Sequence, residues 1–212
     1  VVRLEVEREK FPVEIKSVRP GEGLKCEGYQ VLAFPVNHGN NAVGWCLVED
    51  QRLGRFDVEK ARQFGIPEGP LFGKVHHGED VEVNGRVIHA EDLVGESRPG
   101  RRVVYTGDTR PCEATVECAR GADILIHEAT FSDEEQDRAR ETFHSTAAEA
   151  ARVAKECDVR SLILTHLSAR YSEDPGILKN EANAVFRGAR IAHDGLSLEV
   201  DYDNSSLSEV GS

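Results

Sequence analysis

Acidic and imidazole side chains stand where three apolar runs of the sequence end. "RRVVYTGDT" reaches Asp108, "ADILIHEATF" reaches Glu128, and "RSLILTHLSARY" reaches His166. Each run has the length and apolar content of a buried strand. A carboxylate at the end of a buried strand costs free energy unless it is paired, hydrogen-bonded or bound to a metal. The pattern therefore predicts one functional site assembled from the ends of neighbouring strands.

His38 adds a fourth residue of this kind. It follows the apolar run that enters "FPVNHGNNAVGW" and precedes a turn. Two imidazoles and a carboxylate, from His38, His166 and Asp108, suit zinc, and a carboxylate can bridge two metal ions. Each residue alone has a simpler explanation: His38 could bond a nearby carbonyl, and Asp108 could cap a turn by accepting the N–H groups of Thr109 and Arg110. Together they favour a two-metal hydrolase.

Glu128 and His144 form a second kind of pair. Glu128 ends a predicted strand, and His144 directly precedes a predicted helix, so both can point into a shared cleft. A carboxylate that orients an imidazole raises its basicity and selects its tautomer, as general acid catalysis requires. His127 precedes Glu128 in the strand and should face the opposite side in a structural role.

Three polar residues follow His166 in "LTHLSARY", namely Ser168, Arg170 and Tyr171. They are candidates for an anion-binding cluster, because the guanidinium group of Arg binds phosphate through two parallel hydrogen bonds. The alternative is an ordinary surface arginine at the entry to a helix.

Strands and helices alternate differently in the two parts of the chain. The first third predicts strands at 1–7, 11–18, 29–36 and 42–50, then a helix at 57–65, a loop at 65–73 and a hairpin at 81–88 around Asn84-Gly85. From residue 101 onward, strands at 101–107, 122–128 and 160–166 alternate with helices at 112–120, 133–141, 145–156 and 174–188, before a final strand pair within 190–202. This pattern predicts one mixed α/β unit over residues 1–203 and a disordered tail over 204–212.

Composition narrows the functional class. The chain has 212 residues, 39% of them hydrophobic, and a net charge of −12. It contains neither a span of about 20 apolar residues nor a signal-peptide core, so a cytoplasmic location is expected.

Five scattered cysteines favour neither disulfides nor a thiolate zinc site. The acidic charge limits any RNA contact to a local surface and suggests salt adaptation as a hypothesis. The sequence contains no Met, which favours part of a longer protein.

Five motifs in order resemble the ribonuclease Z family of the metallo-β-lactamase superfamily. They are "NHGNNAVGW", "GDT", "HEATF", "HSTAAEAA" and "LTHLSARY", with further similarity in "GIPEGPLFGKVHHGEDV". The resemblance runs from about Tyr29 to Tyr202. It implies an α/β fold of the metallo-β-lactamase type, an αββα four-layer sandwich that would be incomplete at the N-terminus of this chain.

The resemblance also implies roles for the site residues. His38 would bind one zinc ion, Asp108 would bridge two, and His166 would bind the second. Glu128 and His144 would form the relay that protonates the leaving 3′ oxygen. The implied reaction is zinc-dependent removal of 3′ trailers from precursor tRNA, by a cytoplasmic enzyme that is a homodimer.

Two parts of the family pattern are not found in the sequence. One is the zinc-binding His-x-His-x-Asp-His motif, without which the chain alone should bind zinc weakly and cut little. The other is a basic flexible arm that holds tRNA. Ser168, Arg170 and Tyr171, with backbone around Gly69 and Pro70, are the candidates that the resemblance offers for holding phosphate.

Two other functions stay open. One is a metallo-phosphodiesterase or esterase of the same superfamily that acts on a small substrate. The other is a non-catalytic half that supports RNA processing only beside a metal-binding partner.

Overall fold

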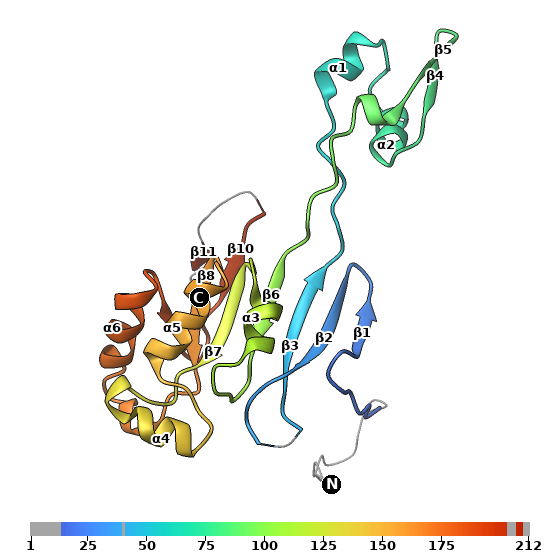
Figure 1. The fold of residues 1–212 in the computed structure, drawn as a ribbon. Coiled ribbons are helices and arrows are strands. Elements are labelled where there is room, and N and C mark those ends of the chain that lie inside the picture. The colour runs from blue at the N-terminus through green and yellow to red at the C-terminus, as the bar shows by residue number, and fades with distance from the viewer. Residues whose placement is uncertain (1–13, 40, 203–206, 210–212) are drawn as a thin grey trace, which may run out of the picture.

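The structure is a computed structural model that describes residues 14–39, 41–202 and 207–209. Its centre is a seven-stranded sheet with the strand order β1-β2-β3-β6-β7-β8-β9 (Figure 1). Neighbouring strands run antiparallel from β1 to β6 and parallel from β6 to β9. The strands are β1 Gly23–Cys26, β2 Tyr29–Pro35, β3 Val43–Glu49, β6 Arg102–Tyr105, β7 Ile124–Glu128, β8 Ser161–Thr165 and β9 Arg190–Ile191.

The parallel strands β7 and β8 are almost continuously apolar because side chains pack on both of their faces. Leu125 and Leu162 belong to the main apolar cluster, on the face that carries the helices. Ile124 and Ile163 form a separate cluster on the opposite face, together with side chains of β10, Leu198–Val200. Parallel strands covered on both sides need apolar residues at successive positions. The first polar positions therefore come where these strands end.

Helices α3, α5 and α6 cover one face of the sheet (Figure 1). α5 begins with the expected capping box: the Thr146 hydroxyl accepts from the Glu149 backbone, and the Glu149 carboxylate accepts from the Thr146 backbone. Most buried side chains of α5 are alanines, which let the helix lie close to the sheet. The body contains α3 Glu113–Ala119, α4 Gln136–Glu141, α5 Ala147–Glu156 and α6 Gly176–Val185, with 3₁₀ turns at Asp133–Glu135 and Ala169–Tyr171.

A small lobe, residues 54–95, projects from one end of the sheet between β3 and β6 (Figure 1). Its own apolar cluster includes the buried side chains of Val75, Ile88 and Leu93. The sequence predicts a single unit and does not anticipate this lobe. The lobe consists of α1 Val58–Gln63, α2 Pro70–His76, β4 Val81–Val83, β5 Arg86–Ile88 and a 3₁₀ turn at Ala90–Asp92.

Two chain segments form the neck of the lobe. They are joined by bridges between Arg52 and Arg98 and between Phe56 and Val94. A Cβ atom added at Gly54 would lie 1.8 Å from the carbonyl oxygen of the opposing segment. The close approach of the two segments therefore requires glycine at this position.

Several local expectations are corrected. The sequence predicts a loop over 65–73, but Pro70 begins α2, because proline suits the first turn of a helix and Val75 packs into the lobe. A strand expected at 11–18 is absent from its described part, residues 14–18, whereas β1 at Gly23–Cys26 was not expected. The strand expected at 1–7 lies outside the described residues.

The C-terminal segment also differs from expectation. Residues 190–202 contain β9 and β10, but these strands do not pair with each other; β9 pairs with β8, and β10 pairs with β11, Leu207–Glu209. The prediction of a disordered tail over 204–212 is therefore wrong at 207–209, where backbone pairing with β10 forms a strand. The other residues of that tail lie outside the described residues.

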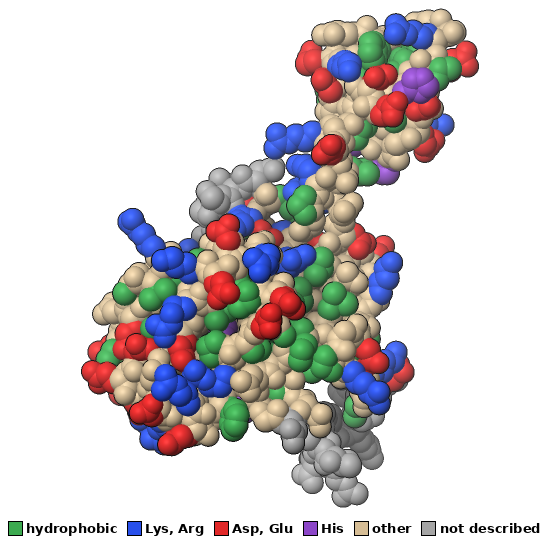
Figure 2. Space-filling model, viewed as in Figure 1, with side chains coloured by type: hydrophobic (Ala, Val, Ile, Leu, Met, Phe, Trp, Pro, Cys, Tyr) green, Lys and Arg blue, Asp and Glu red, His purple; other side chains and the backbone are tan. Residues whose placement is uncertain are grey.

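The surface carries charges of both signs. On the face shown in Figure 2, acidic and basic side chains are interspersed over both the body and the lobe. The lobe has 8 acidic and 5 basic side chains, so its composition is acidic and not basic. Within the part of the chain that the structure describes, no helix has the length and apolar character needed to cross a membrane.

Replacement of Glu49 tests how much its ion pair with Arg101 stabilises the fold. The Arg101 side chain donates to its carboxylate at 2.8 Å and holds its pKa down at about 2. A lowered folded-state pKa stabilises the protein above pH 4.5, and this stabilisation is lost as the pH falls toward 2. Because the pair is partly exposed, we expect Glu49→Gln to lower the free energy of unfolding by about 1 kcal/mol at pH 7.

Urea unfolding at a series of pH values measures this effect. The difference between the wild type and Glu49→Gln should narrow below pH 4.5. The control is Glu68→Gln, which removes an exposed partner of Arg62 and should leave unfolding unchanged. A difference that stays constant down to pH 3 would contradict the role of the Glu49 carboxylate.

Candidate active site

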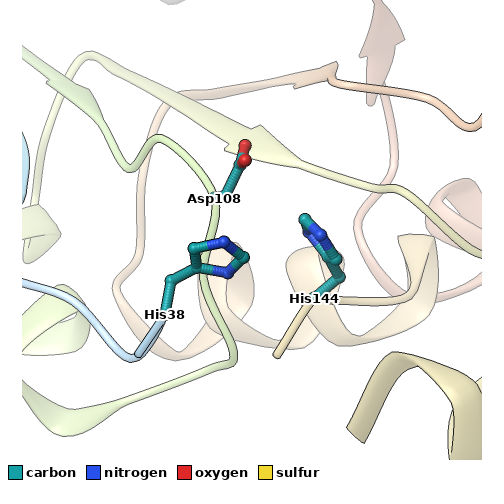
Figure 3. Close-up of side chains that lie close together, drawn as sticks. All are labelled: His38, Asp108 and His144. Atoms are coloured by element: carbon teal, nitrogen blue, oxygen red, sulfur yellow. The ribbon is translucent and has the colours of Figure 1, made fainter. Parts of the chain in front are cut away.

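The predicted site residues converge at the end of the sheet opposite the lobe. β6, β7 and β8 are parallel and in register, so their C-terminal ends bring Asp108, Glu128 and His166 to one edge. β3 is antiparallel to β6, which brings the loop between β2 and β3, and with it His38, to the same edge. Figure 3 shows His38, Asp108 and His144 pointing toward a common space. The prediction that strand ends assemble one cluster is confirmed.

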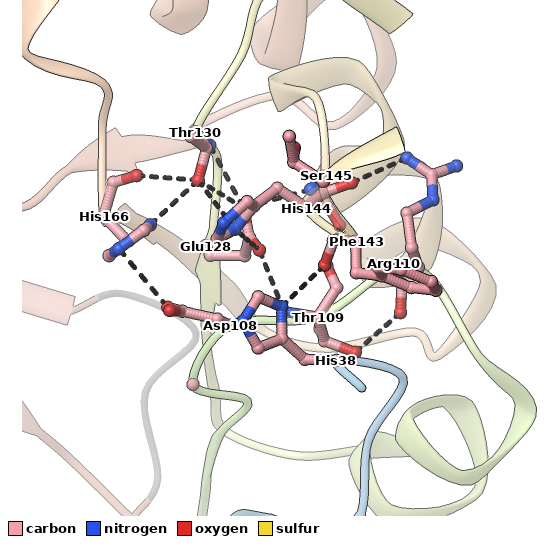
Figure 4. Close-up of polar contacts among 12 residues, drawn as sticks. His38, Asp108, Thr109, Arg110, Glu128, Thr130, Phe143, His144, Ser145 and His166 are labelled. Carbon is pink, nitrogen blue, oxygen red and sulfur yellow. Dashed lines mark hydrogen bonds and ion pairs between the residues drawn. The ribbon is translucent and has the colours of Figure 1, made fainter. Parts of the chain in front are cut away.

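The Glu128 carboxylate is completely buried and accepts five hydrogen bonds (Figure 4). Oε1 accepts from the Thr109 backbone at 2.8 Å and from His144 Nδ1 at 2.7 Å. Oε2 accepts from the Thr130 hydroxyl at 2.7 Å, the Thr130 backbone at 3.2 Å and the Ser145 backbone at 3.0 Å. Such a set of donors compensates for the desolvation of a buried carboxylate. Glu128 thereby fixes the loops that follow β6 and β7 and the loop that precedes α5.

His144 lies between the other two imidazoles of the site. Its ring centroid is 4.8 Å from that of His38 and 5.2 Å from that of His166. Because Nδ1 donates to Glu128, Nε2 is the ring atom left to act on a ligand. The predicted contact between Glu128 and His144 is confirmed.

His38 uses one ring nitrogen in a structural contact. Its Nδ1 donates to the carbonyl oxygen of Phe143 at 2.9 Å, so the simple explanation expected from the sequence does occur. This bond does not conflict with metal binding, because it fixes the tautomer and leaves Nε2 as a ligand atom. Phe143 itself has a left-handed backbone with a φ of 60°, a strained conformation held beside the site.

Asp108 is not a turn cap. The backbone N–H of Thr109 donates to Glu128, and the backbone N–H of Arg110 donates to the carbonyl of Asn37. The side chain of His166 lies beside it, with Nε2 3.5 Å from Oδ1 of Asp108. The carboxylate therefore remains half-exposed at the site and able to bind a cation.

His166 directly follows β8 in a left-handed conformation, with a φ of 53°. Its Nδ1 lies 2.8 Å from the hydroxyl of Thr130, and its Nε2 is turned toward Asp108. A non-glycine residue with this backbone geometry is strained, and such strain is concentrated at functional sites.

The side chains present suit a divalent metal. One group of His38, Asp108 and His144, and another of Glu128, His144 and His166, each have ligand atoms within 4.8 Å of one another. In all three histidines Nδ1 has a protein partner, so Nε2 is the common ligand atom. The sequence assigns His38, Asp108 and His166 to metal binding and does not anticipate His144 in these groups. Imidazole nitrogen and carboxylate oxygen are donors that zinc accepts.

A buried ion pair supports the His144 loop and was not expected from the sequence. The Arg110 guanidinium donates to both carboxylate oxygens of Glu149, at 2.6 and 2.5 Å, and also to the carbonyl of His144 at 2.8 Å. Arg110 and Glu149 are 39 positions apart, so only the capping role of Glu149 is visible in the sequence.

The candidate phosphate-binding residues have partners within the protein. Arg170 forms an ion pair with Glu135, and the Tyr171 hydroxyl donates to the same carboxylate. The Ser168 backbone donates to the carbonyl of Thr130 at 3.1 Å. Their role in phosphate binding therefore stays a prediction.

Gly69 and Pro70 begin α2 in the lobe, which projects from the opposite end of the sheet (Figure 1). The backbone around Gly69 and Pro70 therefore does not reach the candidate active site of its own chain, and the expectation that it holds phosphate there is wrong.

His127 has a structural role, as its strand position predicts. It is completely buried, and its Nδ1 donates to the carbonyl of Glu128 at 2.7 Å. Burial lowers its pKa, which keeps the ring neutral.

Comparisons with known proteins agree with this fold. The family model of the "Beta-lactamase superfamily domain" matches residues 76–167. The metallo-β-lactamase fold protein YhfI from Bacillus subtilis covers 84% of this chain, with a TM-score of 0.53 and 21% identity over 52% of its own chain. The short form of human tRNase Z also covers 84%, with a TM-score of 0.50 and 24% identity over 46% of its own chain. The fold and site define a member of the metallo-β-lactamase superfamily.

Sequence relatives identify the family more closely. A protein named ribonuclease Z from Haloferax volcanii is 54% identical over 92% of this chain and 62% of its own length. Proteins of the same name from Myxococcus xanthus and Archaeoglobus fulgidus are 51% and 48% identical over 94% and 92% of the chain. The chain belongs to the ribonuclease Z family. It spans less than two thirds of the length of these relatives, between 62% and 66%.

The pair of Arg110 and Glu149 provides a test of how the His144 loop is held. Glu149→Gln leaves the Arg110 charge buried without its partner, so the free energy of unfolding should fall by about 3 kcal/mol. Urea denaturation followed by circular dichroism measures this change. The control Asp137→Asn removes an exposed partner of Arg140 and should leave stability unchanged. A small effect of Glu149→Gln, equal to that of the control, would show that the buried pair does not stabilise the fold.

Proposed function

We propose that this chain carries part of the active site of a zinc-dependent endoribonuclease that removes 3′ trailers from precursor tRNA. The observation that carries the proposal is the Glu128–His144 pair, 2.7 Å apart, with the His144 ring centroid 4.8 Å from that of His38 and 5.2 Å from that of His166. The relatives named ribonuclease Z support this choice of reaction. We assign the activity to the chain together with the part of those relatives that it does not cover.

The metal-binding side of the proposed site would use His38, Asp108 and His166. Zinc is the cofactor we propose, with two ions in the complete site, and Asp108 would supply the carboxylate that both ions share. A divalent metal held there would act as a Lewis acid toward the phosphodiester. The chain supplies two Nε2 atoms and a carboxylate for this purpose.

The acid–base side of the proposed site would use His144 and Glu128. An oxygen derived from water attacks phosphorus, and the bond from phosphorus to the 3′ oxygen breaks. The leaving oxygen takes a proton from Nε2 of His144. Glu128 holds the ring through Nδ1 and so presents Nε2 to the leaving oxygen. The products are a tRNA with a free 3′-hydroxyl and a trailer with a 5′-phosphate.

A homodimer is the proposed assembly. The lobe projects from the end of the sheet opposite the site (Figure 1), so its surface is directed away from a substrate bound by the same chain. A second copy would be needed for a lobe to meet that substrate, and sedimentation equilibrium measures the oligomeric state. The cytoplasmic location stays a prediction.

Replacing His144 tests the acid role directly. The assay protein is the chain joined to the part of the Haloferax volcanii relative that the alignment leaves uncovered. His144→Ala should lower kcat for a 3′-extended precursor tRNA by about 10²–10⁴-fold, the usual contribution of general acid catalysis. Cleavage of bis(p-nitrophenyl) phosphate should change much less, because nitrophenolate leaves without a proton. The control is the surface variant His193→Ala, which should retain both activities.

The two substrates also separate the competing functions. An equal loss on both substrates would place His144 in metal binding or folding and not in proton transfer. Wild-type turnover of the small diester far above that of precursor tRNA would favour a phosphodiesterase with a small substrate. If His144→Ala retains full activity on both substrates, His144 has no part in the mechanism.

Metal removal tests the ligand set. After treatment with EDTA, the assay protein should recover cleavage of precursor tRNA when Zn²⁺ is added. Titration calorimetry measures the affinity of each variant for Zn²⁺. Asp108→Asn should weaken zinc binding by at least about tenfold, because it removes the anionic ligand of the group. Asp137→Asn, on the exposed face of α4, is the matched control. Equal affinity in Asp108→Asn and the wild type would exclude Asp108 as a ligand.

A further inference from the structure

Thr130 connects the acid–base pair to the proposed metal ligands. Its hydroxyl oxygen lies 2.7 Å from Oε2 of Glu128 and 2.8 Å from Nδ1 of His166 (Figure 4). Its backbone N–H donates to the same carboxylate, and its carbonyl accepts from the backbone of Ser168. The side chain is only 7% exposed, so water has little access to compete for these bonds.

The direction of the hydrogen bonds follows from the single hydroxyl proton. The Glu128 carboxylate is an acceptor and takes that proton over the shorter of the two acceptor contacts, since the carbonyl of His166 lies farther away at 3.1 Å. Toward the imidazole nitrogens within reach, Nδ1 of His166 at 2.8 Å and Nδ1 of His144 at 3.3 Å, the Thr130 oxygen can then only accept. Nδ1 of His166 must therefore carry a hydrogen, and in the neutral ring Nε2 carries a lone pair.

We propose that Thr130 is a positioning residue that holds His166 as its Nδ1–H tautomer and directs its Nε2 lone pair toward Asp108. The inference rests on the metal site of the proposed function. Glu128 acts here through Thr130, so one carboxylate orients two imidazoles: His144 by direct contact and His166 through a hydroxyl. Residues that orient a ligand in this way tune metal affinity without touching the metal.

The backbone conformation and the exposure of His166 explain why its ring needs the hydrogen bond to Thr130. With a φ of 53°, the residue is strained, and its side chain is nearly half exposed, at 48%. Packing alone therefore constrains the ring weakly. The hydrogen bond from Nδ1 to Thr130 is the contact that defines which nitrogen faces the site.

The test uses the 212-residue chain without metal. Two-bond ¹H–¹⁵N NMR spectra above pH 8 report the tautomer of each histidine. The wild type should show the Nδ1–H form at His166. Thr130→Val has the same shape but no hydroxyl, and His166 should lose its preference for this form. Thr130→Ser restores the hydroxyl and should restore the tautomer, while Thr115→Val removes another buried hydroxyl and should leave His166 unchanged.

Zinc titration of the same variants gives the second readout, with each variant joined, as for the His144 assay, to the part of the Haloferax volcanii relative that this chain does not cover. Thr130→Val should bind Zn²⁺ about 10–100-fold more weakly than the wild type, and Thr130→Ser should bind nearly as tightly. An unchanged His166 tautomer in Thr130→Val overturns the proposal, as does an Nε2–H form in the wild type. Thr130→Ala replaces the valine variant if the latter does not fold. If no variant binds zinc, the proposed metal function fails, while the tautomer still decides the role of Thr130.

Discussion

The buried Glu128 carboxylate is the interaction on which the site depends. A charge without solvent needs several donors, and these come from three loops that are separate in the sequence. Thr109 follows β6, Thr130 follows β7, and His144 and Ser145 precede α5. Satisfying one carboxylate therefore fixes the relative position of all three loops. The catalytic geometry is a consequence of the same bonds that make the buried charge tolerable.

Much of this arrangement could be predicted from local patterns in the sequence. Parallel strands covered on both faces have continuous apolar runs, so the polar residues that end them, Asp108, Glu128 and His166, are conspicuous. Parallel strands in register then bring their ends to one edge of the sheet. The capping box of Thr146 and Glu149 is equally local, because both partners lie within one helical turn. For such features the spacing in the sequence already contains the geometry.

Features that depend on distant partners could not be predicted in this way. Glu149 caps its own helix, but its ion pair with Arg110 joins residues 39 positions apart. Arg170 has the composition of an anion-binding residue, yet Glu135 already neutralises it. The lobe was hidden for a related reason: its Gly- and Pro-rich segment is typical of loops, and only the packing of Val75 and its neighbours makes α2 a helix. In α2, tertiary packing overrode local propensity, and in the two ion pairs the partner is too distant in the sequence to be recognised from it.

A single rule unites the three histidines of the site. His38 donates from Nδ1 to a carbonyl, His144 to a carboxylate and His166 to a hydroxyl. Two of these partners are neutral and one is a carboxylate, and this difference matches the roles proposed above. In the proposed function, a carbonyl or a hydroxyl would hold the tautomer that binds a metal through Nε2, whereas the buried carboxylate would orient the ring of the acid. The group bonded to Nδ1 would then separate the two proposed ligands, His38 and His166, from the proposed acid, His144.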